Sequence, residues 1–79
     1  MRSYGYSISA RVCVIHKNIP NMLTQITTAF SADGINIENL ANGSKDEIAY
    51  TIVETAQSVG SEVLSRVEQI EGVIRVLCY

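Results

Sequence analysis

The alternation of apolar and polar positions predicts a strand followed by a helix in the first part of the chain. Residues 7–15 alternate between the two kinds of side chain, which is typical of a half-buried strand. Pro20 suits the first turn of a helix, where its missing N–H costs nothing. Gly34 is expected to end that helix. The apolar side chains between these two residues follow helical spacing: Met22, Leu23, Ile26, Ala29 and Phe30.

A hairpin is expected in the middle of the chain. Residues 35–41 and 47–54 both resemble strands, and residues 42–46 between them are typical of a turn. This segment begins with Asn42-Gly43, and an Asn-Gly pair between two such strands is a strong hairpin signal. The spacing leaves room for a loop longer than two residues. The first strand of this hairpin is expected at an edge of the sheet, where another chain can pair with it.

The rest of the chain predicts a second helix and a final strand, which together define the fold. Ser58 or Ser61 is expected to cap the helix, Gly72 to end it, and residues 73–78 to form the strand. The apolar positions of the helix are Val59, Val63, Val67 and Ile70. The order βαββαβ with right-handed crossovers gives an α+β, ferredoxin-like sandwich: one antiparallel sheet of four strands with both helices on one face.

Composition and charge exclude several classes of protein. The 79 residues allow one domain with a marginal core, and the 47% of hydrophobic residues is ordinary for a globular chain. Six basic and eight acidic residues give a net charge of −2 without a basic block, which disfavours nucleic acid as a partner. No apolar run approaches the length that spans a membrane. Cys13 and Cys78 lack metal-ligand spacing and are interpreted as reduced strand residues of a cytoplasmic protein.

The side chains that catalysis would need are missing from the sequence. His16 is the only histidine, and no serine or cysteine is placed near it by spacing. There is no glycine-rich phosphate loop, and the loop after the first strand has no paired thiolates for a metal. Tyr50 is the only aromatic residue of the third predicted strand, where an RNA-binding sheet would stack bases. We therefore expect neither catalysis nor a bound metal or cofactor in this chain.

Three polar side chains flank the first helix and suggest a small-molecule site. The start of this helix, near Asn21 and Met22, has unpaired N–H groups and a positive dipole end that attracts a carboxylate. His16 can donate to a carboxylate or hydroxyl, and the amide of Asn18 can accept from an ammonium. Asn36 follows the helix at the start of the next strand. Together these groups match the carboxylate, ammonium and side chain of an α-amino acid.

Each of the three side chains also has a simpler interpretation. A single histidine at the end of a strand is more often solvated than bound to a ligand. Asn18 is as well suited to capping the helix. Asn36 lies between two isoleucines, as the outward residue of a half-polar strand would. The residues alone therefore leave an amino-acid pocket as one hypothesis among these.

Three segments of the sequence resemble the ACT domain. They are HKNIPNML at 16–23, GINI at 34–37 and EIAYTIVE at 47–54. More narrowly, the likeness is to the C-terminal regulatory domain of D-3-phosphoglycerate dehydrogenase, the first enzyme of serine synthesis, and it extends from residue 11 to residue 79. This resemblance implies that residues 7–79 are the ACT domain and residues 1–6 a linker or disordered N-terminus. It also implies an NAD-dependent parent enzyme, whose nucleotide-binding and catalytic regions are not in this chain.

The resemblance implies a ligand and a mode of assembly as well. In this family two ACT domains pair side by side into a sheet of eight strands, and L-serine binds at the seam as a feedback inhibitor. The serine-contacting side chains fall on His16 and Asn18, and on Asn36 of the neighbouring subunit. Asn21 stands where ACT domains commonly have glycine, so its side chain would narrow the approach to the ligand or add a contact. There are two alternatives to a serine-binding domain. The chain could be an ACT domain for another amino acid or small effector, or a module that only oligomerises.

Overall fold

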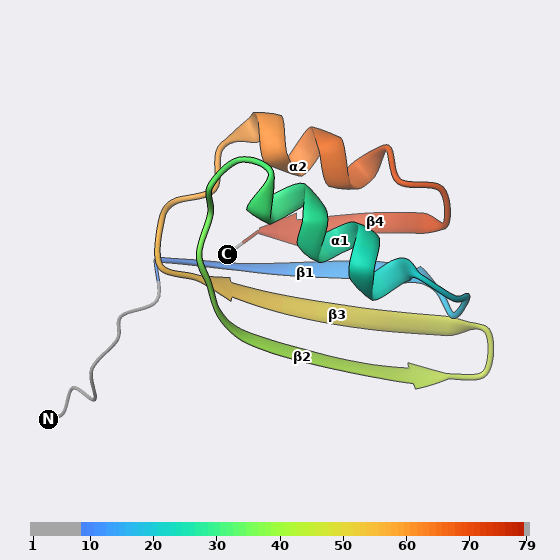
Figure 1. Cartoon of the computed structure of the whole chain (residues 1–79). Helices are drawn as coiled ribbons and strands as arrows, with labels where there is room; N and C mark the ends of the chain where they lie inside the picture. The colour runs from blue at the N-terminus through green and yellow to red at the C-terminus, as the bar shows by residue number, and fades with distance from the viewer. Residues whose placement is uncertain (1–8, 79) are drawn as a thin grey trace, which may run out of the picture.

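The expected order of helices and strands is confirmed. The computed structural model describes residues 9–78 (Figure 1), and the linker expected at residues 1–6 lies outside them. The elements follow one another as β1 (Ala10–Lys17), α1 (Met22–Ser31), β2 (Ile37–Lys45), β3 (Ile48–Thr55), α2 (Ser61–Glu68) and β4 (Val73–Cys78).

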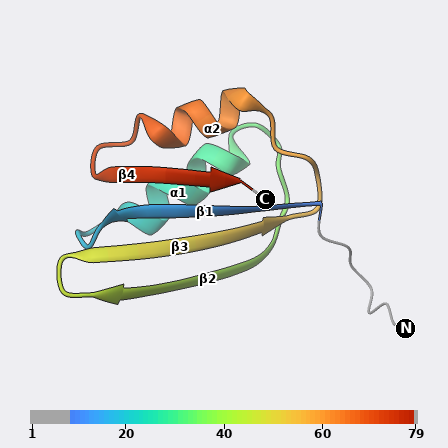
Figure 2. The same cartoon turned by 180° about the vertical axis from the view of Figure 1, so that it is seen from behind.

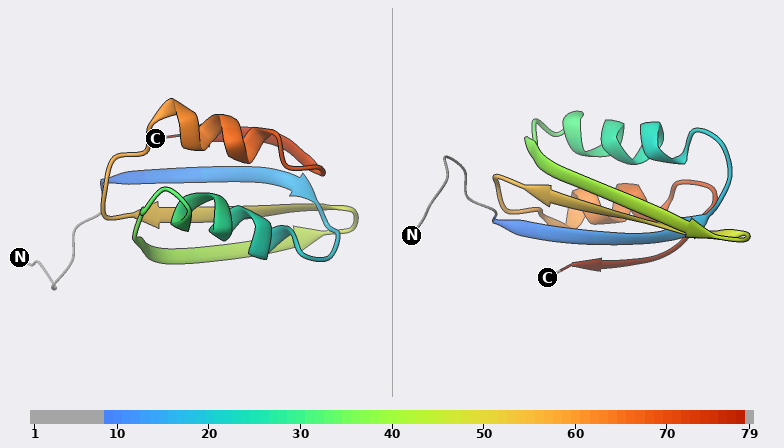
Figure 3. Two further views of the ribbon diagram at one scale, coloured as in Figure 1. Left: turned by 45° about the horizontal axis from the view of Figure 1, so that its top comes forward. Right: turned by 90° about the horizontal axis from the view of Figure 1, so that it is seen from below.

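The four strands form one antiparallel sheet in the order β2-β3-β1-β4. β1 lies in the centre of the sheet, and β2 and β4 lie at its two edges (Figure 2). Both helices cover the same face (Figure 3), as right-handed crossovers between these strands require. The ferredoxin-like α+β sandwich is therefore confirmed, and β2 is the edge strand that the sequence predicts.

The core lies between the helices and one face of the sheet. Alternation along β1 turns every second side chain toward the helices, so Val12 and Val14 are fully buried. α1 and α2 each bury one apolar stripe against these strands. Burying a side chain of this kind contributes roughly 1.5–3 kcal/mol. The cluster consists of Val12, Val14, Met22, Ile26, Ala29, Phe30, Val53, Val63 and Val67.

The turn predicted at residues 42–46 is wrong. β2 continues to Lys45, and only Asp46 and Glu47 separate it from β3. Gly43 lies opposite Tyr50 in the ladder, and a Cβ on Gly43 would lie 2.7 Å from the hydroxyl oxygen of Tyr50. The glycine thus makes room for an aromatic ring across the strand pair. Asp46 takes the positive φ of 58° that the tight turn needs.

The sequence predicts the cap at the end of α1 correctly, but not the cap at the start of α2. Gly34, with a φ of 74°, follows α1 as expected, and the N–H of Ile35 donates to the carbonyl of Phe30 at 3.1 Å in a Schellman arrangement. The N-cap of α2 is Gly60, and no side chain bonds there. The prediction of a Ser58 or Ser61 cap is therefore wrong. Glu62 lies in the first turn of α2, where its charge favours the helix dipole.

Candidate functional site

His16 is buried rather than solvated, because β1 runs two residues further than the sequence suggests. Its place in the alternation is on the helix-facing side of the strand, and it is 5% exposed. Nε2 lies 2.9 Å from Oγ1 of Thr51, and Nδ1 lies 2.9 Å from the carbonyl oxygen of Lys17. A carbonyl only accepts, so Nδ1 carries a proton and donates it. Both ring nitrogens of His16 therefore have protein partners.

Asn18 joins the loop after β1 to the turn between β2 and β3. Its side-chain nitrogen donates to the carbonyl of Asp46 at 3.1 Å, and its backbone N–H donates to the carbonyl of Glu47 at 2.8 Å. The interpretation of Asn18 as a helix cap is wrong, because the N-cap of α1 is Asn21. Within residues 9–78 the side-chain oxygen of Asn18 accepts no hydrogen bond.

The start of α1 presents uncapped backbone N–H groups. Asn21 has a left-handed φ of 68°, and its side chain makes no capping bond. Glycine adopts this conformation most readily, and asparagine is among the few other residues that tolerate it. The first helical bond runs from the N–H of Gln25 to the carbonyl of Asn21 at 3.0 Å. The N–H groups of Met22 and Leu23 consequently have no partner within residues 9–78.

These groups meet at a cavity of about 380 Å³ between the start of α1 and the sheet, which we call the helix-start cavity. Its volume is in the usual range for small-molecule sites. Four of the five residues predicted for the site line it together: His16, Asn18, Asn21 and Met22. The prediction of a binding role for these residues still rests on the sequence, but the fold does place the four side by side.

Asn36 lies at the other end of the molecule from the helix-start cavity. β2 begins at Ile37, and it runs from Asn36 at one end to the cavity at the other (Figure 1). The backbone of Asn36 is held there, since its N–H donates to Oε1 of Gln57 at 2.8 Å and its carbonyl accepts from Ala56 at 3.1 Å. A single chain therefore does not bring Asn36 to the other four residues.

Three polar residues of the cavity were missed by the sequence analysis. Asn42 and Ser44 were assigned to a turn, whereas they lie on β2 and face the start of α1. Thr51 is fully buried between Ala49 and Val53, which share its side of β3. The signal that could have revealed Thr51 is a hydroxyl on the apolar face of an alternating strand, because such a group needs a polar partner.

Neither metal binding nor membrane crossing receives support from the described residues. Within residues 9–78 no three histidine, cysteine or acidic side chains gather as metal ligands would. Among the helices that the structure describes, none is both long and apolar enough to cross a membrane.

Among the solved structures of similar fold are two ACT domains and a regulatory subunit. An ACT domain protein from Streptococcus pneumoniae is similar over 92% of this chain and 89% of that one, with 14% identity and a TM-score of 0.73. The ACT domain from GTP pyrophosphokinase of Chlorobium tepidum is similar over 89% and 95%, with 20% identity and a TM-score of 0.68. The regulatory subunit of aspartate kinase from Thermus thermophilus is similar over 89% and 49%, with 15% identity and a TM-score of 0.71. At these identities the likeness shows the fold alone.

The family is shown by the sequence itself. A model of the AHAS small subunit-like ACT domain matches residues 12–75, and the chain belongs to this family. It is therefore an ACT domain, a regulatory domain of the amino-acid-binding type. None of the curated proteins matches the sequence. The narrower likeness to the dehydrogenase domain stays a prediction.

Proposed function

We propose that this domain senses a free α-amino acid, which binds in the helix-start cavity at the seam between two copies of the chain. The observation that carries the proposal is the meeting of complementary groups in one cavity. The N–H groups of Met22 and Leu23 face a ligand carboxylate at the positive end of α1. The side-chain oxygen of Asn18 accepts from the ligand ammonium.

The second copy supplies the group that one chain leaves distant. β2 is an edge strand with almost all of its residues exposed, so its outer hydrogen-bonding groups are free to pair with another strand. In an antiparallel pair of β2 strands, the start of one strand lies beside the end of the other. Asn36 of each chain would then reach the cavity of its neighbour. Since both copies hold the ligand, binding stabilises the pair.

L-serine is the first ligand to test. In this hypothesis the parent enzyme is D-3-phosphoglycerate dehydrogenase, and L-serine is its feedback inhibitor. Support comes from the matching positions of His16, Asn18 and Asn36 in the resembling segments. The geometry changes the role expected of His16. Because both of its ring nitrogens have protein partners, a serine hydroxyl would have to share Thr51 rather than find a free imidazole.

Another amino acid is the second candidate, and two observations favour it. The family model that matches is that of the AHAS small subunit-like ACT domain, not that of the dehydrogenase domain. In addition, Ile19 and Leu23 line the cavity and are 44% and 36% exposed, which would suit an apolar ligand side chain. The parent enzyme and the ligand would then both differ from the serine hypothesis, while the carboxylate and ammonium contacts would stay the same.

A panel of amino acids tests the proposal. The protein is titrated with L-serine, D-serine and the apolar L-amino acids, and heat of binding and the shift in melting temperature are recorded. One L-amino acid is expected to raise the melting temperature, and Asn18→Ala should abolish that shift. Gln25→Ala, on the exposed side of α1, is the matched control and should retain it. If no amino acid gives heat or a shift, the domain is an oligomerisation module and the sensing function is wrong.

A further inference from the structure

The basic side chains of this acidic protein gather on one face of the sheet. Opposed residues in a ladder share a face, so the register places Lys17 and Lys45 with Ile48, and Arg75 with Ile15. This is the face that the helices leave uncovered (Figure 3), and we call it the open face. Of the five basic residues within 9–78, the open face has four: Arg11, Lys17, Lys45 and Arg75.

Three of these charges are not neutralised by the chain. Arg11 bonds to Glu54 across the β1–β3 pair. Within residues 9–78, however, Lys17, Lys45 and Arg75 have no carboxylate within the 4.0 Å of an ion pair. Asp46 and Glu47 lie in the turn at one end of this face and line its cavity, so with Glu54 three carboxylates stand against its four cations. Glu62, Glu68 and Glu71 lie on α2 or just after it. Among residues 9–78 the open face thus keeps a small excess of positive charge, whereas the helix layer has an excess of negative charge.

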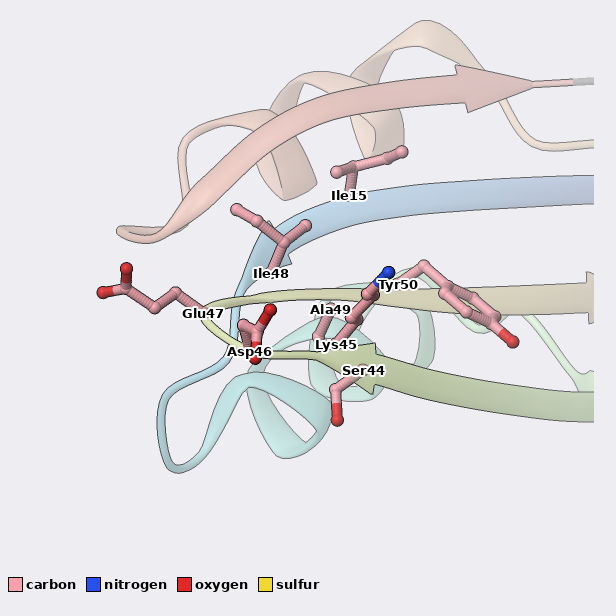
Figure 4. A pocket seen from close by; sticks show the side chains of 8 residues that line it. All are labelled: Ile15, Ser44, Lys45, Asp46, Glu47, Ile48, Ala49 and Tyr50. Atoms are coloured by element: carbon pink, nitrogen blue, oxygen red, sulfur yellow. The ribbon is translucent and has the colours of Figure 1, made fainter.

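Apolar side chains lie between these charges. Ile48 and Tyr50 are 47% and 44% exposed, although side chains of this size are usually covered. They line a cavity of about 540 Å³ together with Ile15 and the turn after β2 (Figure 4). Ile52 and Leu77 continue the apolar surface along the sheet. A continuous apolar surface with a polar rim is the usual mark of an interaction site.

We propose that the open face is a docking surface for an acidic amphipathic helix of a partner protein. A helix with one apolar stripe is what covers the opposite face of this same sheet. Its apolar stripe would pack on Ile15, Ile48 and Tyr50, and its flanking carboxylates would meet the lysines and Arg75. The proposal does not depend on an amino-acid ligand, because none of these side chains lines the helix-start cavity.

The charges and side chains of the open face disfavour two other occupants. A second copy stacked face to face would bring two sets of three unneutralised positive charges together, which is unfavourable. Single-stranded nucleic acid is bound by successive aromatic platforms. Within the described strands the open face offers one aromatic side chain, Tyr50. An acidic apolar helix satisfies both the charge and the exposed apolar area.

The test uses a synthetic peptide of about 20 residues with leucine at helical spacing and glutamate elsewhere. Its binding is followed by fluorescence anisotropy. The double variant Lys17→Gln, Arg75→Gln is expected to weaken binding roughly fivefold to tenfold, as two exposed charge pairs would. The control Gln25→Glu, Ser65→Glu carries the same net charge on the helix layer and should bind within about twofold of the wild type. Ile48→Ser should weaken binding without a change of charge.

Four results would overturn the docking proposal. Equal weakening by the two double variants would show that only net charge matters. Equal binding of a peptide with lysine in place of glutamate would show that the open face does not recognise acidic side chains. Tighter binding of oligouridylate, lost in Lys17→Gln, Arg75→Gln, would make nucleic acid the partner. Self-association that the same variant abolishes in sedimentation would make a second copy the occupant. Peptide binding that persists in Asn18→Ala separates this result from any failure of amino-acid sensing.

Discussion

Nε2 of His16 and Oγ1 of Thr51 lie 2.9 Å apart inside the core, on adjacent central strands. This bond joins the only histidine of the chain to a threonine with no exposed surface. Because Nδ1 donates to the Lys17 carbonyl, Nε2 of a neutral His16 accepts a hydrogen bond from the hydroxyl of Thr51. The pair forms the floor of the helix-start cavity, so its integrity decides both local stability and the shape of the site.

Replacing Thr51 by valine should destabilise the fold by about 1–3 kcal/mol. Valine keeps the shape of the side chain but leaves Nε2 of His16 buried without a partner. Urea unfolding of the two proteins measures the difference. Thr24→Val, on the exposed side of α1, is the control and should change stability by no more than about 0.5 kcal/mol. Equal losses in the two variants would show that the hydrogen bond contributes nothing.

The order of elements was predictable from the sequence because it depends on local signals that the fold does not override. Helical spacing from Met22 to Phe30 and the glycine at position 34 both predict α1 and its end, as found. Strand alternation likewise predicts the buried face of β1. These signals depend on neighbours within one helical turn or one strand, which a single sequence contains.

The errors arose where a distant partner decides the local structure. Gly43 resembles a turn glycine, yet it lies in β2 because Tyr50 needs the space above it. His16 resembles a loop residue, yet Thr51, 35 positions away, gives it a buried partner. Asn36 follows the helix closely in the sequence, yet the length of β2 separates it from the cavity. Tertiary contacts of this kind override local propensity.

Gly43→Ala should displace the ring of Tyr50 and cost about 1 kcal/mol. The Cβ would lie 2.7 Å from the Tyr50 hydroxyl oxygen, and this end of the ring is exposed enough to move. In a Tyr50→Ser background the same substitution should be neutral or stabilising, because glycine within a strand is itself unfavourable. A double-mutant cycle by urea unfolding measures the coupling.

Gly60→Ala serves as the control for that cycle. A Cβ at Gly60 meets nothing within 4 Å, so its effect should add to that of Tyr50→Ser without coupling. Coupling as strong for Gly60 as for Gly43 would show that Tyr50 acts on the whole fold rather than on the residue across from it.

Acid should remove the stabilisation that Glu54 provides. Hydrogen bonds from Arg11, at 2.7 Å, and from Asn39, at 3.0 Å, hold the pKa of Glu54 below its usual range, against the opposing effect of burial. A carboxyl whose pKa is lower in the folded state stabilises the fold fully above its unfolded pKa of about 4.3. The stabilisation is lost as the pH falls through the folded pKa.

Urea unfolding of the wild type and Glu54→Gln at pH 7 and at steps down to about pH 3 checks this expectation. The wild type should be the more stable at pH 7, and the two should converge in acid. Arg11→Gln should show a weaker dependence than the wild type, because the bond from Arg11 is the largest cause of the lowered pKa. A gap between wild type and Glu54→Gln that does not narrow in acid would contradict the assignment.

A shared site predicts that two inactive variants restore binding when they are mixed. Asn18 belongs to the cavity of its own chain, whereas Asn36 would complete the cavity of the neighbour. Asn18→Ala and Asn36→Ala should therefore each bind no L-serine as pure proteins. In a mixed pair one site lacks both asparagines and the other is intact. After random exchange about half of the pairs are mixed, so about one quarter of the wild-type sites should return.

Isothermal titration of the exchanged mixture with L-serine counts the restored sites. The control mixes Asn18→Ala with Asn42→Ala, since both substitutions alter the cavity of the chain that carries them. Every cavity in this second mixture carries one of the two substitutions, so no pair in it contains an intact site. Equal recovery in both mixtures, or full binding by Asn36→Ala alone, would show that each chain holds its ligand without the neighbour.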